Sequence, residues 1–308
     1  MDKIDMNSKE GEQAQKMGFW RFVGRSMERL TWIAAIGAIV VLAVVILFIA
    51  KEITVCFDQP QSQCIWSLAR WNPVSEPARY GIAFLLINSV LLAACATVVA
   101  LPLGLITALY ITEIASAKMA QVFWLLMRVV GAVPPVVVGF LGIVTVTGRN
   151  RTLLLSDGEQ LFLCSVLLAF MAIPRIVCFL IETLRSIPAS FKASSYALGA
   201  SHWQTIVHTI CPAARPGIAA AGLFSFGRVL GDTVIALMLI QILPLNRFAA
   251  NSPLWTVPTA VALGAESAVP GQTHYHLLYL LGLLLAVASF SLSLLGRQLI
   301  RTQRGELE

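Results

Sequence analysis

The sequence has 308 residues, of which 57% are hydrophobic and only 12% are charged, and its net charge is +6. A soluble domain of this length could not bury so much apolar surface in one core, so the composition excludes an ordinary soluble protein. The basic residues are scattered without a stripe of interleaved aromatic residues, which argues against nucleic-acid binding. We therefore expect an all-α integral membrane protein in a lipid bilayer.

Six apolar stretches are long enough to cross a bilayer, whose hydrocarbon core of about 30 Å needs roughly 20 residues of helix. They predict transmembrane helices over residues 30–50, 80–110, 122–147, 161–180, 218–240 and 277–295. Pro134-Pro135 cannot continue regular helical hydrogen bonding, so the part of the third stretch before them is expected to lie along the membrane interface, where Arg128 can reach headgroups. Pro174 is expected to break the fourth helix.

The distribution of charge predicts the topology. Residues 1–29 are polar, and the stretch 30–50 is too long for the h-region of a cleavable signal peptide, so we expect it to remain as the first transmembrane helix. Most loop lysines and arginines lie on the side of both termini, which the positive-inside rule makes cytoplasmic. The expected parts are a cytoplasmic segment 1–29, a helix 30–50, a periplasmic loop 51–79, a core 80–297 and a cytoplasmic tail 298–308.

Cysteines and histidines give few candidate sites. Cys56 and Cys64 share the 51–79 loop, so either a disulfide or two free thiols is compatible with an oxidising compartment. His202 and His208 are six residues apart and share no helix face, so no metal site is expected. Enzymatic activity is not expected, because no paired carboxylates or nucleophile with a base stand out.

The predicted fifth helix contains two charged residues. Arg228 lies about 15 Å from the start of this helix at 1.5 Å per residue, near the middle of the bilayer. A charge there costs roughly 2.5 to 3.5 kcal/mol, so a partner is expected, and Asp232 follows at the i, i+4 spacing. Two interpretations remain open: an internal salt bridge that fixes helix packing, or an anion site in which Asp232 holds the guanidinium between passages. Arg175 in the fourth helix is interpreted as extending to headgroups, with a second anion contact as the alternative.

The polar segment 186–212 has an amphipathic pattern that predicts a short helix beginning near Pro188, with Gly199 supplying a bend. Its spacing resembles the coupling loop of ABC importer permeases: Glu-Ala-Ala, three residues, Gly, nine residues, Ile-x-Leu-Pro. Gly199 and Pro212 match that pattern, whereas Ala193 replaces its Glu. The alternative is an ordinary interfacial helix. The resemblance implies docking on an ATPase through Lys192, Ala193, Ser194, Ser195, Gly199, Trp203 and Pro212.

A second motif narrows the resemblance. Gly227-Arg228, followed by Gly231-Asp232-Thr233, is similar to the Gly-Arg-x-x-Gly-Glu-Thr pattern of the Pst phosphate-importer permeases. Asn88-Ser89 departs from the family, which has Gly-Thr there. Further similar segments favour the PstC branch: Trp71-Asn72-Pro73, Tyr80-Gly81, Leu101 to Gly104 with Glu113, Val133 to Gly139, and Glu266 with His276.

The resemblance implies a six-helix, type I ABC permease (MetI-like) fold in the bacterial inner membrane, with Arg228, Asp232 and Thr233 along a phosphate pathway. It implies four kinds of partner: phosphate, a PstA-like second permease, a dimer of PstB-like ATPase subunits and a periplasmic phosphate-binding protein. The chain has no Gly-x-x-x-x-Gly-Lys-Ser/Thr loop, so ATP and Mg²⁺ are expected on the ATPase and no cofactor on this chain. Alternatives are a permease for sulfate or molybdate, and a non-transporting membrane scaffold or sensor.

Overall fold

The computed structural model describes residues 2–57, 71–73, 78–147, 157–242 and 254–307, and this part of the chain is almost entirely helical. It divides into two units, residues 1–55 and 56–308. The first unit is formed by helix α1 (Asp2–Phe57), whose last two residues belong to the second unit. This helix includes the apolar stretch Met27–Val55. The first helix therefore extends past both ends of the predicted 30–50 range. Cys64 lies outside the described residues, so the structure leaves open whether Cys56 and Cys64 form a disulfide or are free thiols.

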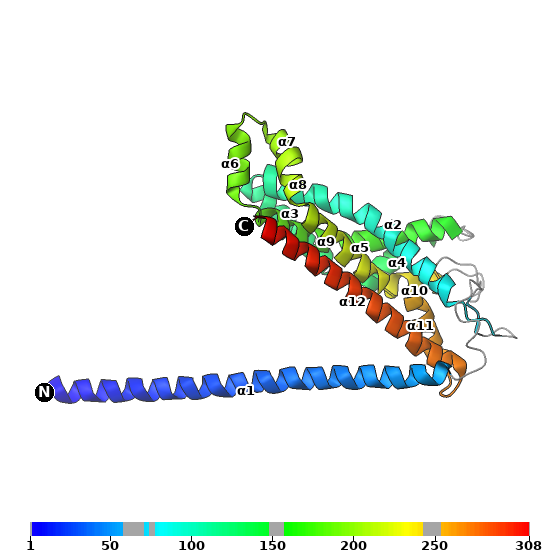
Figure 1. Cartoon of the computed structure of the whole chain (residues 1–308), viewed down its shortest axis with the longest axis horizontal. Coiled ribbons are helices and arrows are strands. Elements are labelled where there is room, and N and C mark those ends of the chain that lie inside the picture. Colours follow the sequence, from blue (N-terminus) through cyan, green and yellow to red (C-terminus); the bar gives the residue numbers. More distant parts are fainter. Residues whose placement is uncertain (1, 58–70, 74–77, 148–156, 243–253, 308) are drawn as a thin grey trace. The chain divides into compact units, whose positions relative to one another are not determined.

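The second unit contains the remaining apolar helices (Figure 1). Four described helices of the chain are long and apolar enough to cross a membrane, or up to six if each of two bent pairs is one span. The unbroken ones in this unit are α2 (Ile82–Leu109, continued by the π-helical turn η2, Tyr110–Ile114), α5 (Asp157–Arg185) and α12 (Thr273–Leu307). The bent pairs are α3 (Ala117–Gly131) with α4 (Pro135–Thr147), at 85°, and α9 (Arg215–Leu230) with α10 (Val234–Ile242), at 43°.

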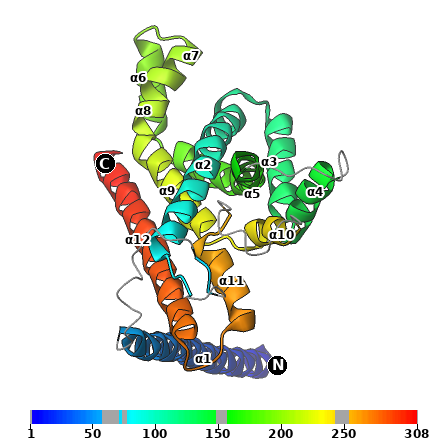
Figure 2. The ribbon, with the colours of Figure 1, turned by 90° about the vertical axis from the view of Figure 1, so that its right-hand side faces the viewer.

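Small residues allow the central helices to approach closely. Helices α2 and α5 pack along much of their length, and a Cβ added at Gly104 of α2 would lie 2.5 Å from Ile176 Cγ2 of α5. Helix α9 packs between α2 and α12 (Figure 2). Gly227 of α9 faces α12, where the Ser289 hydroxyl donates to its carbonyl oxygen at 3.4 Å. Gly227 thus allows α9 and α12 to pack closely.

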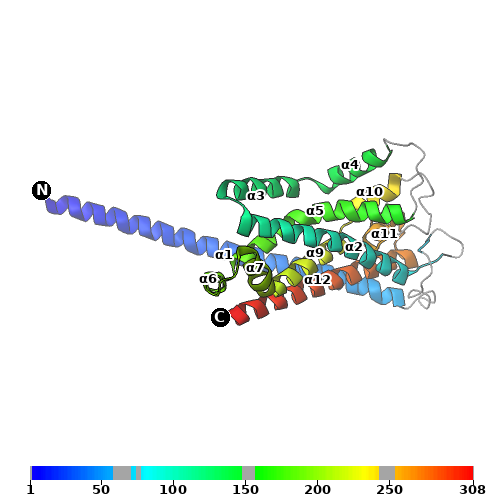
Figure 3. The same cartoon turned by 90° about the horizontal axis from the view of Figure 1, so that it is seen from above.

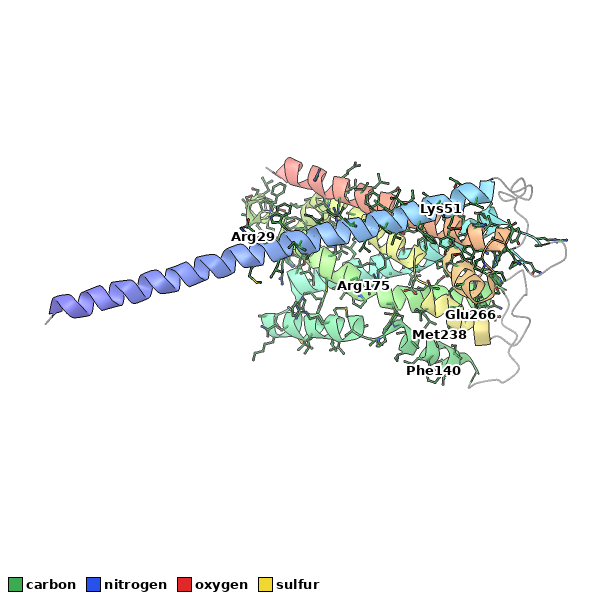
Figure 4. All side chains as sticks on the ribbon, turned by 90° about the horizontal axis from the view of Figure 1, so that it is seen from below. Arg29, Lys51, Phe140, Arg175, Met238 and Glu266 are labelled. Atoms are coloured by element: carbon green, nitrogen blue, oxygen red, sulfur yellow. The ribbon has the colours of Figure 1, made fainter. Side chains whose placement is uncertain are left out.

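The bend between α3 and α4 agrees with the predicted interruption at Pro134-Pro135, because α4 begins at Pro135. Arg128, near the end of α3, places its guanidinium 3.3 Å from the centre of the Trp124 ring, a cation–π contact. On the other side of the bend, α4 packs on α10, and a Cβ at Gly139 would lie 2.9 Å from the sulfur of Met238 (Figure 4). The interfacial location of α3 stays a prediction.

Two expectations about helices were wrong. Pro174 does not break the fourth helix, since α5 runs without interruption from Asp157 to Arg185. Proline is tolerated inside membrane helices where neighbouring helices and local adjustments compensate for the missing hydrogen bond. The predicted fifth helix, which was expected to be continuous, is interrupted between Leu230 and Val234.

Helix α11, Val257–Ser267, was not predicted. Thr256, the residue before the helix, caps its start through a hydrogen-bonded pair with Thr259, and α2 holds this start in place. The Asn88 side-chain amide donates to the Trp255 carbonyl at 3.0 Å, and the Val257 N–H donates to the Ser89 hydroxyl at 2.8 Å. Asn88 and Ser89, which stand where the Pst-type permeases have Gly-Thr, therefore connect α2 to the start of α11.

Candidate functional site: a charged cavity and a helical hairpin

A cavity of about 320 Å³ lies between α5 and α9. Phe179 of α5 and Phe224 of α9 meet edge to face at its wall, with ring centroids 5.4 Å apart. Most of the lining is apolar, which makes its few polar groups conspicuous. The residues that line it are Leu168, Met171, Ala172, Arg175, Ile176, Phe179, Ala221, Phe224, Ser225, Arg228, Val229 and Asp232.

Arg228 and Asp232 both line this cavity, but not as the neighbouring pair predicted on one continuous helix. Helix α9 ends at Leu230, so Asp232 lies in the break before α10. There one carboxylate oxygen accepts a hydrogen bond from the Val234 N–H at 3.2 Å, as a residue preceding a helix often does. Among the described residues, no hydrogen bond or ion pair joins Arg228 to Asp232. The interpretation as an internal salt bridge is therefore not what the structure contains.

The third predicted pathway residue, Thr233, is not among those that line the cavity. It is half-buried, and its carbonyl accepts from the Leu237 N–H at 2.9 Å, which starts the hydrogen bonding of α10. In this structure Thr233 thus helps to begin a helix. Its predicted role in the pathway stays a prediction.

Arg175 was favoured as a residue that extends to the headgroups, yet it lines the same cavity as Arg228. About 15 Å of helix, at 1.5 Å per residue, separates Arg175 from the end of α5 at Arg185. Figure 4 shows Arg175 part-way along α5. The whole of α5, at 29 residues and about 43 Å, is longer than the bilayer core of about 30 Å, so distance along the helix does not decide between the headgroup contact and the anion contact, and both stay predictions.

At the opposite end of this unit from α10 and α11, residues 186–214 form a helical hairpin (Figure 3). Its helices are α6 (Ala189–Ala197), α7 (His202–Thr205), the π-helical turn η3 (Ile206–Ile210) and α8 (Cys211–Ala213). Gly199 has a φ of +81°, a conformation that favours glycine, and it reverses the chain between α6 and α7. Ser201 caps α7 by accepting from the Gln204 N–H at 3.3 Å. The predicted amphipathic segment with a bend at Gly199 is thus present.

The hairpin is attached to the end of α2 by one ion pair. The Lys192 ammonium of α6 lies 2.8 Å from both carboxylate oxygens of Glu113 in η2, whose side chain is only 5% exposed. The His202 ring adds a second connection, 3.1 Å from the Glu113 carbonyl, and lies 2.8 Å from the Tyr196 hydroxyl. Because a carbonyl only accepts, Nε2 of His202 must donate, which leaves Nδ1 of the neutral ring to accept from Tyr196.

The other predicted docking residues lie on the outer surface of the hairpin or stabilise its interior. Ala193, Ser194 and Trp203 are exposed. Ser195 turns inward to hydrogen-bond the Thr205 hydroxyl, and Pro212 lies in α8. A second cavity, of about 480 Å³, opens on this surface and is lined by Ser190, Phe191, Ser194, Ser195, Leu198, Ala200 and Thr209.

A bundle of apolar helices with a broken span, charged side chains in a cavity between two of its helices and an exposed hairpin defines a membrane transport protein. The chain belongs to the family described as "Binding-protein-dependent transport system inner membrane component", which matches residues 100–305. It is therefore the permease component of an ABC importer, a multi-pass membrane protein.

Sequence relatives agree with this family. The chain is 30% identical over 233 residues to the "Probable ABC transporter permease protein YqgH" of Bacillus subtilis, with 74% of each chain covered. It is 24% identical over 321 residues to "Phosphate transport system permease protein PstC 1" of Mycobacterium tuberculosis, covering 91% of this chain and 94% of that one. It is 31% identical to PstA 1 of the same species, but over only 57% of this chain and 55% of that one. The predicted PstC-like character is confirmed.

Solved structures show the same fold. A chain of a bacterial ABC transporter involved in the import of the acidic polysaccharide alginate matches with a TM-score of 0.63 and 17% identity, over 92% of this chain and 98% of that one. A chain of the MetNI methionine ABC transporter matches with a TM-score of 0.54 and 17% identity, over 75% of this chain and 99% of that one. These confirm the predicted all-α, MetI-like fold.

Proposed function

We propose that this chain forms part of the phosphate path of an ATP-driven importer in the bacterial inner membrane, with both termini in the cytoplasm. The observation that carries the proposal is the cavity between α5 and α9, where Arg228 and Asp232 sit among apolar side chains. A guanidinium suits an oxyanion, and the Pst-type relatives are phosphate transport permeases.

The exposure of Arg228 supports a second permease as partner. Its side chain is exposed in the single chain, although about 20 Å of helix separates it from Arg215 at the start of α9. Contact of that charge with hydrocarbon would cost roughly 2.5 to 3.5 kcal/mol. A PstA-like subunit over this face would remove the charge from lipid and enclose the path between the two subunits.

In this proposal, the hairpin of residues 186–214 docks on an ATPase dimer that binds ATP and Mg²⁺, and a periplasmic phosphate-binding protein delivers the anion. Exposed Trp203 and Leu198 offer apolar contact area for that docking. Ala193 supplies no carboxylate, and this favours the second candidate, a membrane scaffold or sensor that does not transport. The ion pair of Lys192 with Glu113 keeps the hairpin attached to the core without that carboxylate.

Uptake of labelled anions separates these functions. The chain would be restored, together with the partner subunits of its own importer, to cells that lack them, and phosphate, sulfate and molybdate uptake would be measured. We expect phosphate uptake alone to return. Uptake of sulfate or molybdate instead would favour the other oxyanion permeases, and no uptake with the chain present in the membrane would favour a scaffold or sensor.

A further inference from the structure

The cavity between α5 and α9 contains two arginines from different helices, Arg175 and Arg228. Among the described residues, neither guanidinium forms a hydrogen bond or an ion pair within the chain. Asp232 is the one carboxylate among the residues that line the cavity, so it can balance only one of the two positive charges. In surroundings of low dielectric constant, the remaining positive charge favours entry of an anion.

Ser225 adds an uncharged donor to the same cavity. The residue is only 9% exposed, and its buried hydroxyl has no hydrogen-bond partner in the described part of the chain. An unsatisfied buried hydroxyl typically costs about 1 to 3 kcal/mol, which a ligand that accepts its hydrogen bond would recover. Ser225 lies three residues before Arg228 on α9, so the two side chains share a helix face. The cavity volume of about 320 Å³ corresponds to roughly ten water molecules at about 30 Å³ each, enough for one tetrahedral oxyanion.

Asp232 adds a hydrogen-bond acceptor to the same cavity. An ionised carboxylate only accepts hydrogen bonds, and one of its oxygens already accepts from the Val234 N–H. Hydrogen phosphate keeps a proton near neutral pH and can donate it to the carboxylate. Sulfate has no proton there and can only repel it. A site that combines donors with one acceptor therefore rejects a fully deprotonated anion of the same shape.

We propose that Arg175, Arg228 and Ser225 together bind a tetrahedral oxyanion, and that Asp232 restricts the site to oxyanions that carry a proton. This inference rests on the proposed function, since the anion bound is the one carried. It assigns to Arg175 a direct contact with the anion and to Asp232 the choice between phosphate and sulfate. Affinity is expected to be weak, with a Kd on the order of 1 mM, because a transport site must release its cargo.

Binding of anions to the purified chain together with its second permease subunit tests the site without the ATPase and the binding protein. Isothermal titration calorimetry in lipid nanodiscs at slightly alkaline pH would compare inorganic phosphate, arsenate and sulfate. We expect phosphate and arsenate to bind similarly, because both keep a proton, and sulfate to bind at least about tenfold more weakly. Arg175→Gln should weaken phosphate binding about tenfold, whereas Arg185→Gln, the same change at the exposed end of α5, should leave it unchanged. Asp232→Asn should bring the affinities for sulfate and phosphate closer together.

Equal affinity of the wild-type chain for sulfate and phosphate would overturn the inference, as would wild-type phosphate affinity in Arg175→Gln or the absence of any anion binding. If Arg175→Gln does not accumulate, the phosphate-to-sulfate ratio of the wild-type chain decides alone. Failure here is distinct from failure of the proposed function, because the uptake of phosphate by the complete importer is measured separately. An importer that takes up phosphate while its purified permease fails these binding tests would leave the function standing and remove the site.

Discussion

Arg228 and Asp232 meet the requirements of a transport site better apart than they would as a bonded pair. A direct ion pair would occupy the guanidinium that an arriving anion has to reach. In the structure the break at Gly231 places Asp232 before α10, where the Val234 N–H holds its carboxylate at the cavity wall. Both charges are therefore available to a solute.

How much of this site the sequence predicts depends on the residue. The position of Arg228 near mid-span follows from counting along an apolar stretch and stays a prediction, while the structure places Arg228 in the last turn of α9, just before the break. The role of Asp232 does not follow from i, i+4 spacing, since that spacing assumes a helix that Gly231 ends. Arg175 shares the cavity because two helices distant in sequence pack side by side, which one sequence cannot reveal.

The reactivity of the Cys211 thiol in α8 reports how buried this part of the hairpin is and how close it lies to the charge of Glu113. Burial, and to a smaller extent the negative charge of Glu113, raises the pKa of the Cys211 thiol. The thiolate is the reactive form, so Cys211 should react with maleimide more slowly than an ordinary exposed cysteine near pH 8. Glu113→Gln removes the smaller cause and should shift the rate profile to lower pH. The measurement is maleimide labelling against pH in a chain in which Cys211 is the sole cysteine.

Lys192→Gln is the control for this experiment, because it breaks the same ion pair but keeps the carboxylate. It should not accelerate labelling. Acceleration by both substitutions would mean that the hairpin opens when the ion pair is lost, and would contradict the electrostatic explanation.

Among the elements, the hairpin of residues 186–214 depends on its contact with η2. In the ion pair between Lys192 and Glu113, the Glu113 side chain is 5% exposed and the Lys192 side chain is 31% exposed. The pair is therefore intermediate between a buried ion pair and a surface ion pair. We expect a coupling free energy of about 1 to 2 kcal/mol between Lys192→Gln and Glu113→Gln in a double-mutant cycle. Unfolding of the purified chain by SDS would measure it. Arg185→Gln combined with Glu113→Gln is the matched control, and equal coupling in the two cycles would refute a specific tie.

The start of α11 gives a second prediction for an element. Asn88→Ala removes the donor to the buried Trp255 carbonyl and should lower the free energy of unfolding by about 1 to 3 kcal/mol. Because Asn88 does not line the cavity, the KM for phosphate uptake should stay unchanged. Thr107→Ala, which loses only a bond within its own helix, should change stability by less than about 0.5 kcal/mol. A changed KM with intact stability would assign Asn88 to substrate choice.

The element boundaries show what a sequence pattern can and cannot predict. Long apolar stretches predict spans well, because the bilayer sets their length. Residues that often interrupt helices predict helix ends less reliably, because α5 continues through Pro174 whereas α9 ends just before Gly231. Helix α11 has only 11 residues and no apolar stretch of transmembrane length, so only its packing on α2 and α12 distinguishes it from a loop.

For the molecule as a whole, composition alone predicts the membrane class, and two spaced motifs predict the permease family. What composition and motifs cannot supply is the pairing of α5 with α9, which creates the cavity. The exposure of Arg228 in the single chain also indicates that the functional unit is larger than one chain.

The most direct test of the central claim is phosphate uptake by the complete importer carrying Arg228→Gln. Uptake per inserted chain should fall about tenfold or more, since a charge-assisted contact contributes about 1.5 to 3 kcal/mol. Arg215→Gln, the same change at the start of the same helix, should retain wild-type uptake, while Asp232→Asn should be impaired. Wild-type uptake by both Arg228→Gln and Asp232→Asn, with normal amounts in the membrane, would contradict the account.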